Sequence, residues 1–168
     1  MKYLKFMLVL GFALTISAAG FAQAKYIGVN GCKMCHNKAE KGAQFAQWQK
    51  TGHAQAYSKL DDAGKKNPDC LKCHSTAGSV DKSLLATIKV DEGVSCESCH
   101  GPGSMYKTAA IMKNKEQALA KGMVEPTEAT CKACHLGKKP DGHKEASKPW
   151  NFAEFKKAIS HPDPTLKK

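Results

Sequence analysis

Residues 93–106 read GVSCESCHGPGSMY and contain a C-x-x-C-H motif. Cys96 and Cys99 are three positions apart on one helical turn, so both thiols can bond the two vinyl-derived carbons at one edge of a porphyrin. The adjacent His100 then lies under the iron and supplies a proximal imidazole ligand. The stretch therefore predicts covalent attachment of a c-type haem.

The same motif occurs four times and uses every cysteine of the 168-residue chain. Eight cysteines in an exported chain would otherwise suggest a disulfide framework, but the histidine after each pair overrides that reading. The sequence thus predicts four c-type haems, each an iron protoporphyrin held covalently, and no disulfides. The attachment residues of the first to fourth motifs are Cys32 and Cys35, Cys70 and Cys73, Cys96 and Cys99, and Cys131 and Cys134. The predicted proximal ligands, in the same order, are His36, His74, His100 and His135.

Residues 1–24 have the features of a secretory signal peptide, namely early lysines, an apolar core over 6–16 and a small-x-small site ending at Ala24. The apolar core has eleven residues, and a bilayer span needs about 20. Cleavage after Ala24 is therefore favoured over an uncleaved membrane anchor. We expect residues 25–168 to form a single tetrahaem cytochrome c domain without a membrane span, located in the periplasm or at the cell surface.

The expected fold is mostly α. The 144 residues after the signal peptide amount to 36 per haem and contain too few aliphatic side chains for an ordinary core. We expect a small multihaem cytochrome fold with little or no β structure, in which short helices and loops pack around the four haems. Apolar spacing predicts helices over 39–60, 108–121 and 151–160. Asn67-Pro68 predicts a helix start before the second motif, and residues 84–90 suit either helix or extended chain.

The charge of the chain favours redox proteins as partners over nucleic acid. Residues 25–168 contain 24 lysines, no arginine and 15 acidic residues, a net charge of +9. Haem propionates would cancel much of this charge. We therefore interpret the lysines as a solubilising surface, as counter-charges for the propionates and as a docking face for acidic redox proteins. Self-association through haem contacts is a further expectation about partners.

Three histidines outside the motifs, His53, His143 and His161, are the candidate distal ligands for four irons. At least one iron must then bind methionine, lysine or water, or have no sixth ligand. His161 ends an apolar helix and is held by the following proline, and we predict that it and His53 are ligands. His143 lies in a polar loop, where a surface role is favoured. Met112 is the candidate thioether ligand, although methionine more often fills gaps in a core.

The order of these motifs resembles the cytochrome c-554 family. The resemblance covers nearly all of the chain after the signal peptide and includes the spacing from Trp48 to His53. Its most specific part is the third site, Gly-Val-x-Cys-Glu-x-Cys-His-Gly-Pro-Gly over 93–103. The resemblance implies a mostly helical fold shaped by haem packing and haems in closely stacked pairs. It also implies electron transfer outside the cytoplasm, mostly bis-histidine haems and one haem without a strong sixth ligand.

The resemblance also implies distal ligands by position. Carried over in this way, His53 would ligate the third haem, on His100, and His161 would ligate the first haem, on His36.

In other members of the family a histidine closely follows Gly-Pro-Gly and ligates the fourth haem. This chain has Met105-Tyr106 there instead. The haem on His135 would then bind Met112 or His143 as its sixth ligand, or have no sixth ligand. The haem on His74 is the other candidate for an open position.

Electron transfer between redox proteins is the function that these features favour. The alternative is a small haem enzyme acting on nitric oxide, hydroxylamine or nitrite at an iron with an open sixth position. Against it, the chain has no C-x-x-C-K site and little sequence left to build a substrate pocket. A third interpretation is that the protein is a subunit of a cytochrome filament. We predict that the protein is not an enzyme and assign no catalytic residue.

Overall fold

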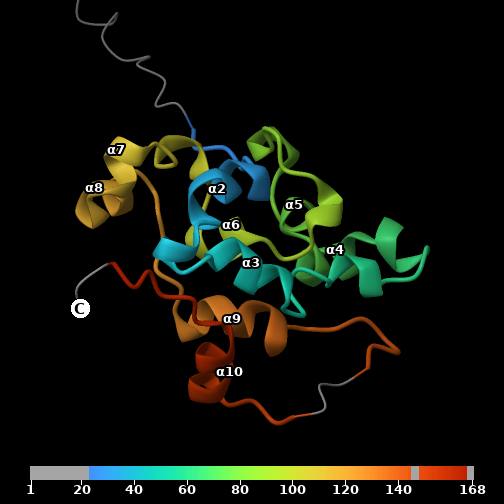
Figure 1. Cartoon of the computed structure of the whole chain (residues 1–168). Coiled ribbons are helices and arrows are strands. Elements are labelled where there is room, and N and C mark those ends of the chain that lie inside the picture. Colours follow the sequence, from blue (N-terminus) through green and yellow to red (C-terminus); the bar gives the residue numbers. More distant parts are fainter. Residues whose placement is uncertain (1–22, 145–147, 166–168) are drawn as a thin grey trace, which may run out of the picture.

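The structure, a computed structural model, describes residues 23–144 and 148–165. The predicted signal peptide therefore lies almost entirely outside the described residues. Short helices joined by loops make up the described chain, and its β pairing is limited to an isolated bridge between Tyr26 and Leu85 (Figure 1). The expected mostly α fold is confirmed. Within the described ranges, no helix has the length and apolar character needed to cross a bilayer.

Four of the helices, α2, α4, α6 and α9, end on the histidine of a C-x-x-C-H motif, so each motif occupies a helical turn. The α-helices are α2 (Val29–His36), α3 (Gln44–Gln49), α4 (Pro68–His74), α5 (Thr76–Ser79), α6 (Cys96–His100), α7 (Ala109–Met112), α8 (Lys115–Ala120), α9 (Glu128–His135) and α10 (Phe152–Ile159). The 3₁₀ turns are η1 (Ala39–Lys41), η2 (Tyr57–Lys59), η3 (Gly64–Lys66), η4 (Lys82–Leu84), η5 (Val90–Glu92) and η6 (Gly103–Met105).

Asparagine caps define the helix starts that the sequence predicted. The Asn67 side chain accepts a hydrogen bond of 2.9 Å from the backbone N–H of Asp69, with Pro68 as the first helical residue of α4. The Asn151 side chain accepts one of 3.2 Å from the N–H of Glu154 at the start of α10. Each cap satisfies an N–H group that has no partner within its helix.

The helical spacing over 39–60 does not give one helix, and the chain already turns near Gly52, where the sequence allowed a helix end. The backbone takes positive φ at Gly42 (96°) and at Ala43 (48°), which breaks the helical path between η1 and α3. Beyond α3 the chain turns before η2. The apolar residues do recur at helical spacing, but the left-handed backbone at Gly42 and Ala43 divides this segment into the short helices η1 and α3.

The helix predicted over 108–121 is also interrupted. Asn114 has an extended backbone, and its side chain accepts from the N–H of Gln117 at 3.0 Å, so it starts α8 as a new helix after α7. Asparagine competes with helix in this way because its side chain can satisfy a local backbone donor. The predicted end at Gly122 is confirmed, with φ of 96° there.

Apolar side chains contribute very little buried core. In the described part of the chain, the largest fully buried side chains are the polar residues Thr76 and Ser75. A domain of this size normally depends on large buried aliphatic and aromatic side chains. The buried hydrophobic residues, three of them alanines, are Ile27, Phe45, Ala56, Ala77, Ile88, Tyr106 and Ala118.

The Glu97 side chain joins the first motif's segment to the third motif. Glu97 is only 2% exposed. Its carboxylate accepts hydrogen bonds from the backbone N–H groups of Ile27 (2.9 Å), Gly28 (2.7 Å) and Gly103 (2.6 Å). Charge-assisted bonds of this kind are about twice as strong as neutral ones. This carboxylate therefore holds the chain before α2 against α6.

A buried hydroxyl cluster joins the second motif's segment to the third. The backbone N–H of Thr76 donates to the carbonyl of Gly93 at 2.9 Å. The Thr76 hydroxyl accepts from the N–H of Ser95 at 2.8 Å and pairs with the Ser98 hydroxyl at 2.7 Å. The segment after α4 is thus fixed to the start of α6.

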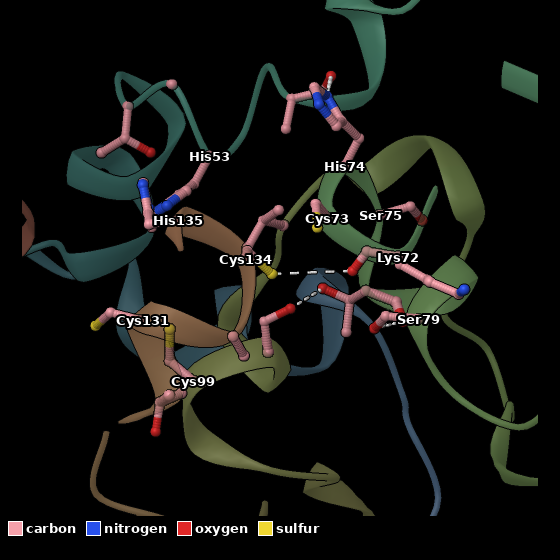
Figure 2. A pocket seen from close by; sticks show the side chains of 18 of the residues that line it. His53, Lys72, Cys73, His74, Ser75, Ser79, Cys99, Cys131, Cys134 and His135 are labelled. Atoms are coloured by element: carbon pink, nitrogen blue, oxygen red, sulfur yellow. Dashed lines mark hydrogen bonds between the residues drawn. The ribbon is translucent and has the colours of Figure 1, made fainter. Parts of the chain in front are cut away.

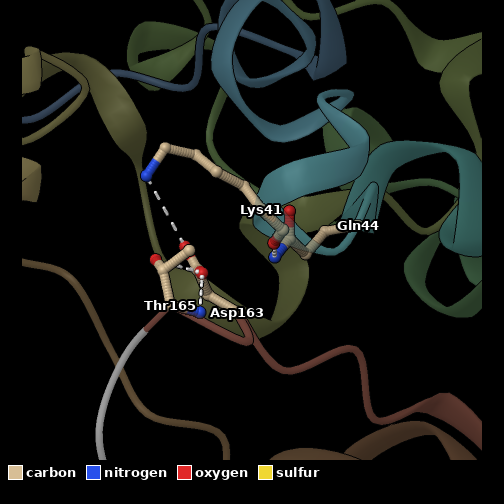
Figure 3. A network of polar contacts seen from close by, with 4 residues as sticks. All are labelled: Lys41, Gln44, Asp163 and Thr165. Atoms are coloured by element: carbon tan, nitrogen blue, oxygen red, sulfur yellow. Dashed lines mark hydrogen bonds and ion pairs between the residues drawn. The ribbon is translucent and has the colours of Figure 1, made fainter.

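The segment after α10 returns to the turn that follows the first motif. Asp163 forms an ion pair of 3.8 Å with Lys41, and the Thr165 hydroxyl and N–H both donate to Asp163 (Figure 3). A Cβ at Gly42 would lie only 2.6 Å from the carbonyl oxygen of Pro162. Close backbone approach therefore requires glycine at this position.

Replacing all eight cysteines by serine should leave the protein largely unfolded, because the apolar side chains alone bury too little surface to offset the conformational entropy of folding. Far-UV circular dichroism should show little helix and no cooperative thermal transition. The haem-loaded protein serves as control. A cooperative transition in the cysteine-free chain would contradict this prediction.

Glu97→Gln should destabilise the haem-loaded protein by about 2–4 kcal/mol, because it removes the charge and turns an NH₂ group toward buried backbone donors. Urea unfolding followed by circular dichroism measures the change. Glu116→Gln, at an exposed position on α8, is the matched control and should change stability by less than about 0.5 kcal/mol. Equal stability of the two variants would show that Glu97 does not hold the chain before α2 against α6.

Candidate haem sites

Six of the seven histidines form three facing pairs, each of which joins a motif histidine to one outside the motifs. Two imidazoles on opposite sides of one metal should have ring centres about 6 Å apart, since each metal–nitrogen bond is about 2 Å and the ring centre lies about 1 Å farther. The residues therefore fit an iron between the two rings of each pair. The centroid distances are 5.9 Å for His53 and His135, 6.2 Å for His74 and His143, and 6.2 Å for His100 and His161.

Hydrogen bonds at Nδ1 leave Nε2 available in three of these rings. Nδ1 lies 2.7 Å from the Ala56 carbonyl in His74, 3.1 Å from the Val124 carbonyl in His100 and 2.8 Å from the Ile159 carbonyl in His161. A carbonyl oxygen only accepts, so Nδ1 carries the hydrogen and donates. The lone pair is then on Nε2, and backbone bonds of this kind orient metal-binding imidazoles in proteins.

Burial favours the neutral form of two paired rings. It is the main factor that lowers the pKa of His53, and the neighbouring His135 and Lys59 lower it further. Burial also lowers the pKa of His100, against the opposing effect of the hydrogen bond to Val124. A metal binds the neutral imidazole, so both shifts suit ligation.

The second and fourth motifs share one cavity of about 1120 Å³. A pocket for one small molecule is typically about 300–1,000 Å³. Figure 2 shows His53 beside His135, with His74, Cys73 and Cys134 around the same space. The size, the mainly apolar walls and the donors all fit porphyrins attached at both motifs. Other lining residues are Cys99, Cys131, His143, Trp150 and Phe155.

Thiols of different motifs lie side by side. Burial, followed by the neighbouring Cys73 thiol, raises the pKa of Cys134 to about 12. The Cys134 thiol also approaches the Lys72 carbonyl at 3.9 Å. These neighbours place the motifs in the spatial order first, third, fourth, second. The three adjacent thiol pairs are Cys32 with Cys96, Cys99 with Cys131, and Cys73 with Cys134.

Two distal assignments implied by the family resemblance differ from the structure. His53 faces His135 of the fourth motif, not His100, because its backbone carbonyl is held by the N–H of Val94 at 3.0 Å while its ring turns toward α9. His161 faces His100, not His36. It follows α10 directly, and the Lys41–Asp163 ion pair holds the chain just beyond it.

His143 lies at the surface, as its polar loop suggested, and its ring nevertheless faces that of His74. A turn brings the loop back over the second motif. The His143 N–H donates to the Pro140 carbonyl at 3.2 Å, and Gly142 has φ of 78°. The sequence signal for this turn was Pro-Asp-Gly directly before the histidine. Both the second and the fourth motifs thus face an imidazole.

Two comparisons with known proteins found similar sequences. The sequence pattern of the family described as cytochrome c554 and c-prime matches residues 31–101. A curated relative, cytochrome c-554 of Nitrosomonas europaea, is 29% identical over 168 aligned residues, covering 83% of this chain and 69% of the relative. Both matches confirm the predicted resemblance to the cytochrome c-554 family. No solved structure matches it at a significant level.

This similarity supports a c-type cytochrome that carries electrons, so the expected general function is confirmed. The matched range spans the first three C-x-x-C-H motifs and ends before the fourth. His143 and His161 also lie beyond it. Their pairing is therefore a finding of this chain's own structure.

Gly93→Ala should destabilise the protein by at least about 3 kcal/mol and disturb His53. Gly93 has φ of 70° and ψ of −150°, a region that essentially only glycine adopts. An added Cβ would also lie 2.7 Å from the His53 carbonyl oxygen and 2.8 Å from that of Ala54. Urea unfolding measures the stability, and electron paramagnetic resonance (EPR) should show an additional high-spin haem.

Gly122→Ala is the control for the backbone strain alone. Gly122 also has positive φ, 96°, but nothing lies within 4 Å of an added Cβ. This variant should lose only about 1–2 kcal/mol and keep the wild-type spin states. If Gly93→Ala behaved like Gly122→Ala, the proposed contact with His53 would have no effect on ligation.

Proposed function

We propose that the protein is an exported tetrahaem electron carrier with one haem bound covalently at each C-x-x-C-H motif. The observation that carries this proposal is the set of three facing imidazole pairs, each built on a different motif. Haem supplies an iron that gains and loses one electron reversibly, while the protein sets its ligands, burial and surroundings.

Each of these three pairs provides both axial ligands of one haem in the proposal. His74 binds with His143 at the second motif, His100 with His161 at the third, and His135 with His53 at the fourth. Two imidazoles lower the reduction potential of a haem compared with one imidazole and a thioether. The paired sites are therefore suited to passing electrons at low potential.

The order of neighbouring thiols supports a relay through the molecule. The first motif contacts the third through Cys32 and Cys96, and the second contacts the fourth through Cys73 and Cys134. The third and fourth motifs are linked by Cys99 beside Cys131. The first and second motifs then form the two ends of the row, so electrons entering at one end leave at the other.

An exported location and redox-protein partners complete the proposal. The signal-peptide pattern of residues 1–24 supports export, as does the attachment of c-type haems outside the cytoplasm. Lys59, Lys138 and Lys144 are exposed and line the cavity of the second and fourth motifs. They are suited to balance haem propionates and to attract an acidic redox protein. Action on a nitrogen species remains the alternative function, and it would need an iron with a free sixth position.

The purified, exported protein should contain four haems and no free thiol, because all eight cysteines become thioethers. Intact-mass spectrometry and the pyridine haemochrome assay give the haem count, and alkylation after denaturation gives the thiol count. A redox titration should be fully reversible.

The control is the double variant Cys131→Ser, Cys134→Ser, which should lose one haem and keep three. A wild-type protein with fewer than four haems, or with disulfides between motif cysteines, would refute the tetrahaem proposal.

A further inference from the structure

His36 differs from the other motif histidines because no imidazole faces it. All seven histidines belong to the described part of the chain, and the three outside the motifs already face His74, His100 and His135. We infer that the first motif's haem has no histidine as its sixth ligand and is the site where this protein binds small exogenous haem ligands. This inference rests on the proposed function, since it requires a haem at that motif.

His161 is the histidine whose placement decides between the first and third motifs. His36 lies close enough to His100 for its charge to contribute to the lowered pKa of His100, after the larger effects of burial, the Val124 hydrogen bond and His161. The His161 ring nevertheless faces His100, with its Nδ1 bonded to the Ile159 carbonyl. The structure therefore assigns this shared candidate to the third motif.

Contacts on both sides of His161 hold that choice in place. On one side, α10 precedes it directly, and Phe155 of that helix stacks on His135 at 5.9 Å. On the other, Asp163 pairs with Lys41 in the turn after the first motif. His36 is thus left without an imidazole although the C-terminal segment passes near it.

Two side chains of the first motif are open to solvent. Cys35 is the one exposed motif cysteine, whereas the other seven are partly buried. Met34, within the same motif, is 76% exposed, and as part of its own attachment turn it cannot reach the distal side of that haem. A ligand from solvent can approach such a site without opening the cavity of the second and fourth motifs. The site is also at one end of the proposed row.

The ligand class that fits is a small molecule that coordinates ferrous haem without needing a shaped pocket, such as carbon monoxide. Binding forms one iron–ligand bond, displaces at most a weakly held water and transfers no electron. Bis-histidine irons resist such ligands because both axial positions are filled. The number of ligands bound per protein therefore counts the haems that lack a second strong ligand.

The test counts high-spin haems in the oxidised holoprotein by EPR and carbon monoxide bound per reduced protein by titration. Wild type should give one of each. His53→Ala, His143→Ala and His161→Ala should each raise both counts from one to two, because each variant frees a different haem. If all three add a new open haem, the wild-type open haem is none of theirs and belongs to His36. Met112→Leu is the control and should leave both counts at one.

Several results would overturn the inference. A wild type without a high-spin haem, with a methionine-to-iron charge-transfer band that Met112→Leu abolishes, would give the first haem a thioether ligand. If a histidine variant keeps four haems and both of its counts stay at one, the open iron is at the motif whose histidine faces the replaced residue. Failure of the proposed function itself would appear separately, as a haem count below four.

An alanine variant that does not load four haems is replaced by the methionine variant at the same position. Methionine keeps a ligand, so carbon monoxide binding should stay at one while a methionine-to-iron charge-transfer band appears. Absence of that band for His53, His143 or His161 would show that the histidine is not a ligand and would also overturn the inference.

Discussion

The carboxylate of Glu97 is the contact on which the relation between the first and third motifs depends. It lies between the two cysteines of the third motif, is almost completely buried and accepts hydrogen bonds from backbone groups of Ile27, Gly28 and Gly103. A buried carboxylate without these donors would be costly, so the chain before α2 must return to α6 for the charge to be tolerated. The close approach of Cys32 and Cys96 follows from this return. One charged side chain within a C-x-x-C-H motif thus positions a second motif 64 residues away in sequence.

Hydrogen bonds between polar groups fix the relative positions of the chain segments, which apolar packing does in most domains. The Thr76 hydroxyl, bonded to the Ser95 N–H, fixes the second motif's segment to the third as Glu97 fixes the first. Hydrogen bonds are directional, so they can set the position of backbone segments without filling the space between them. That space is left as an apolar cavity of about 1120 Å³ beside the second and fourth motifs. A chain whose apolar core is supplied by cofactors needs a framework of this kind, since aliphatic side chains in the same place would compete with the porphyrins.

The sequence predicted local features well and spatial pairings poorly, for a physical reason. The C-x-x-C-H motif is a local device, and Asn67 and Asn151 cap helices through contacts two or three residues away, so both could be read from spacing. Gly42, at the break, also lies against the carbonyl of Pro162, a long-range contact that no local pattern contains. The pairing of His143 with His74 likewise depends on where a loop returns. Its polar neighbours indicated solvent correctly, since His143 is exposed, but they gave no sign that its ring faces that of His74 after the Pro-Asp-Gly turn.

The histidines of the motifs and the histidines outside them are positioned by different parts of the chain. Each proximal histidine is fixed by covalent neighbours on the same helical turn, so its role cannot pass to another haem. The distal histidines His143 and His161 come from a loop and a chain segment beyond the range that matches the family pattern. A change in loop path costs little compared with rebuilding a helix. The distal ligands are therefore the part of the design that can change most easily. In this chain their placement gives imidazole pairs to the second, third and fourth motifs and leaves the exposed first motif to differ from the rest.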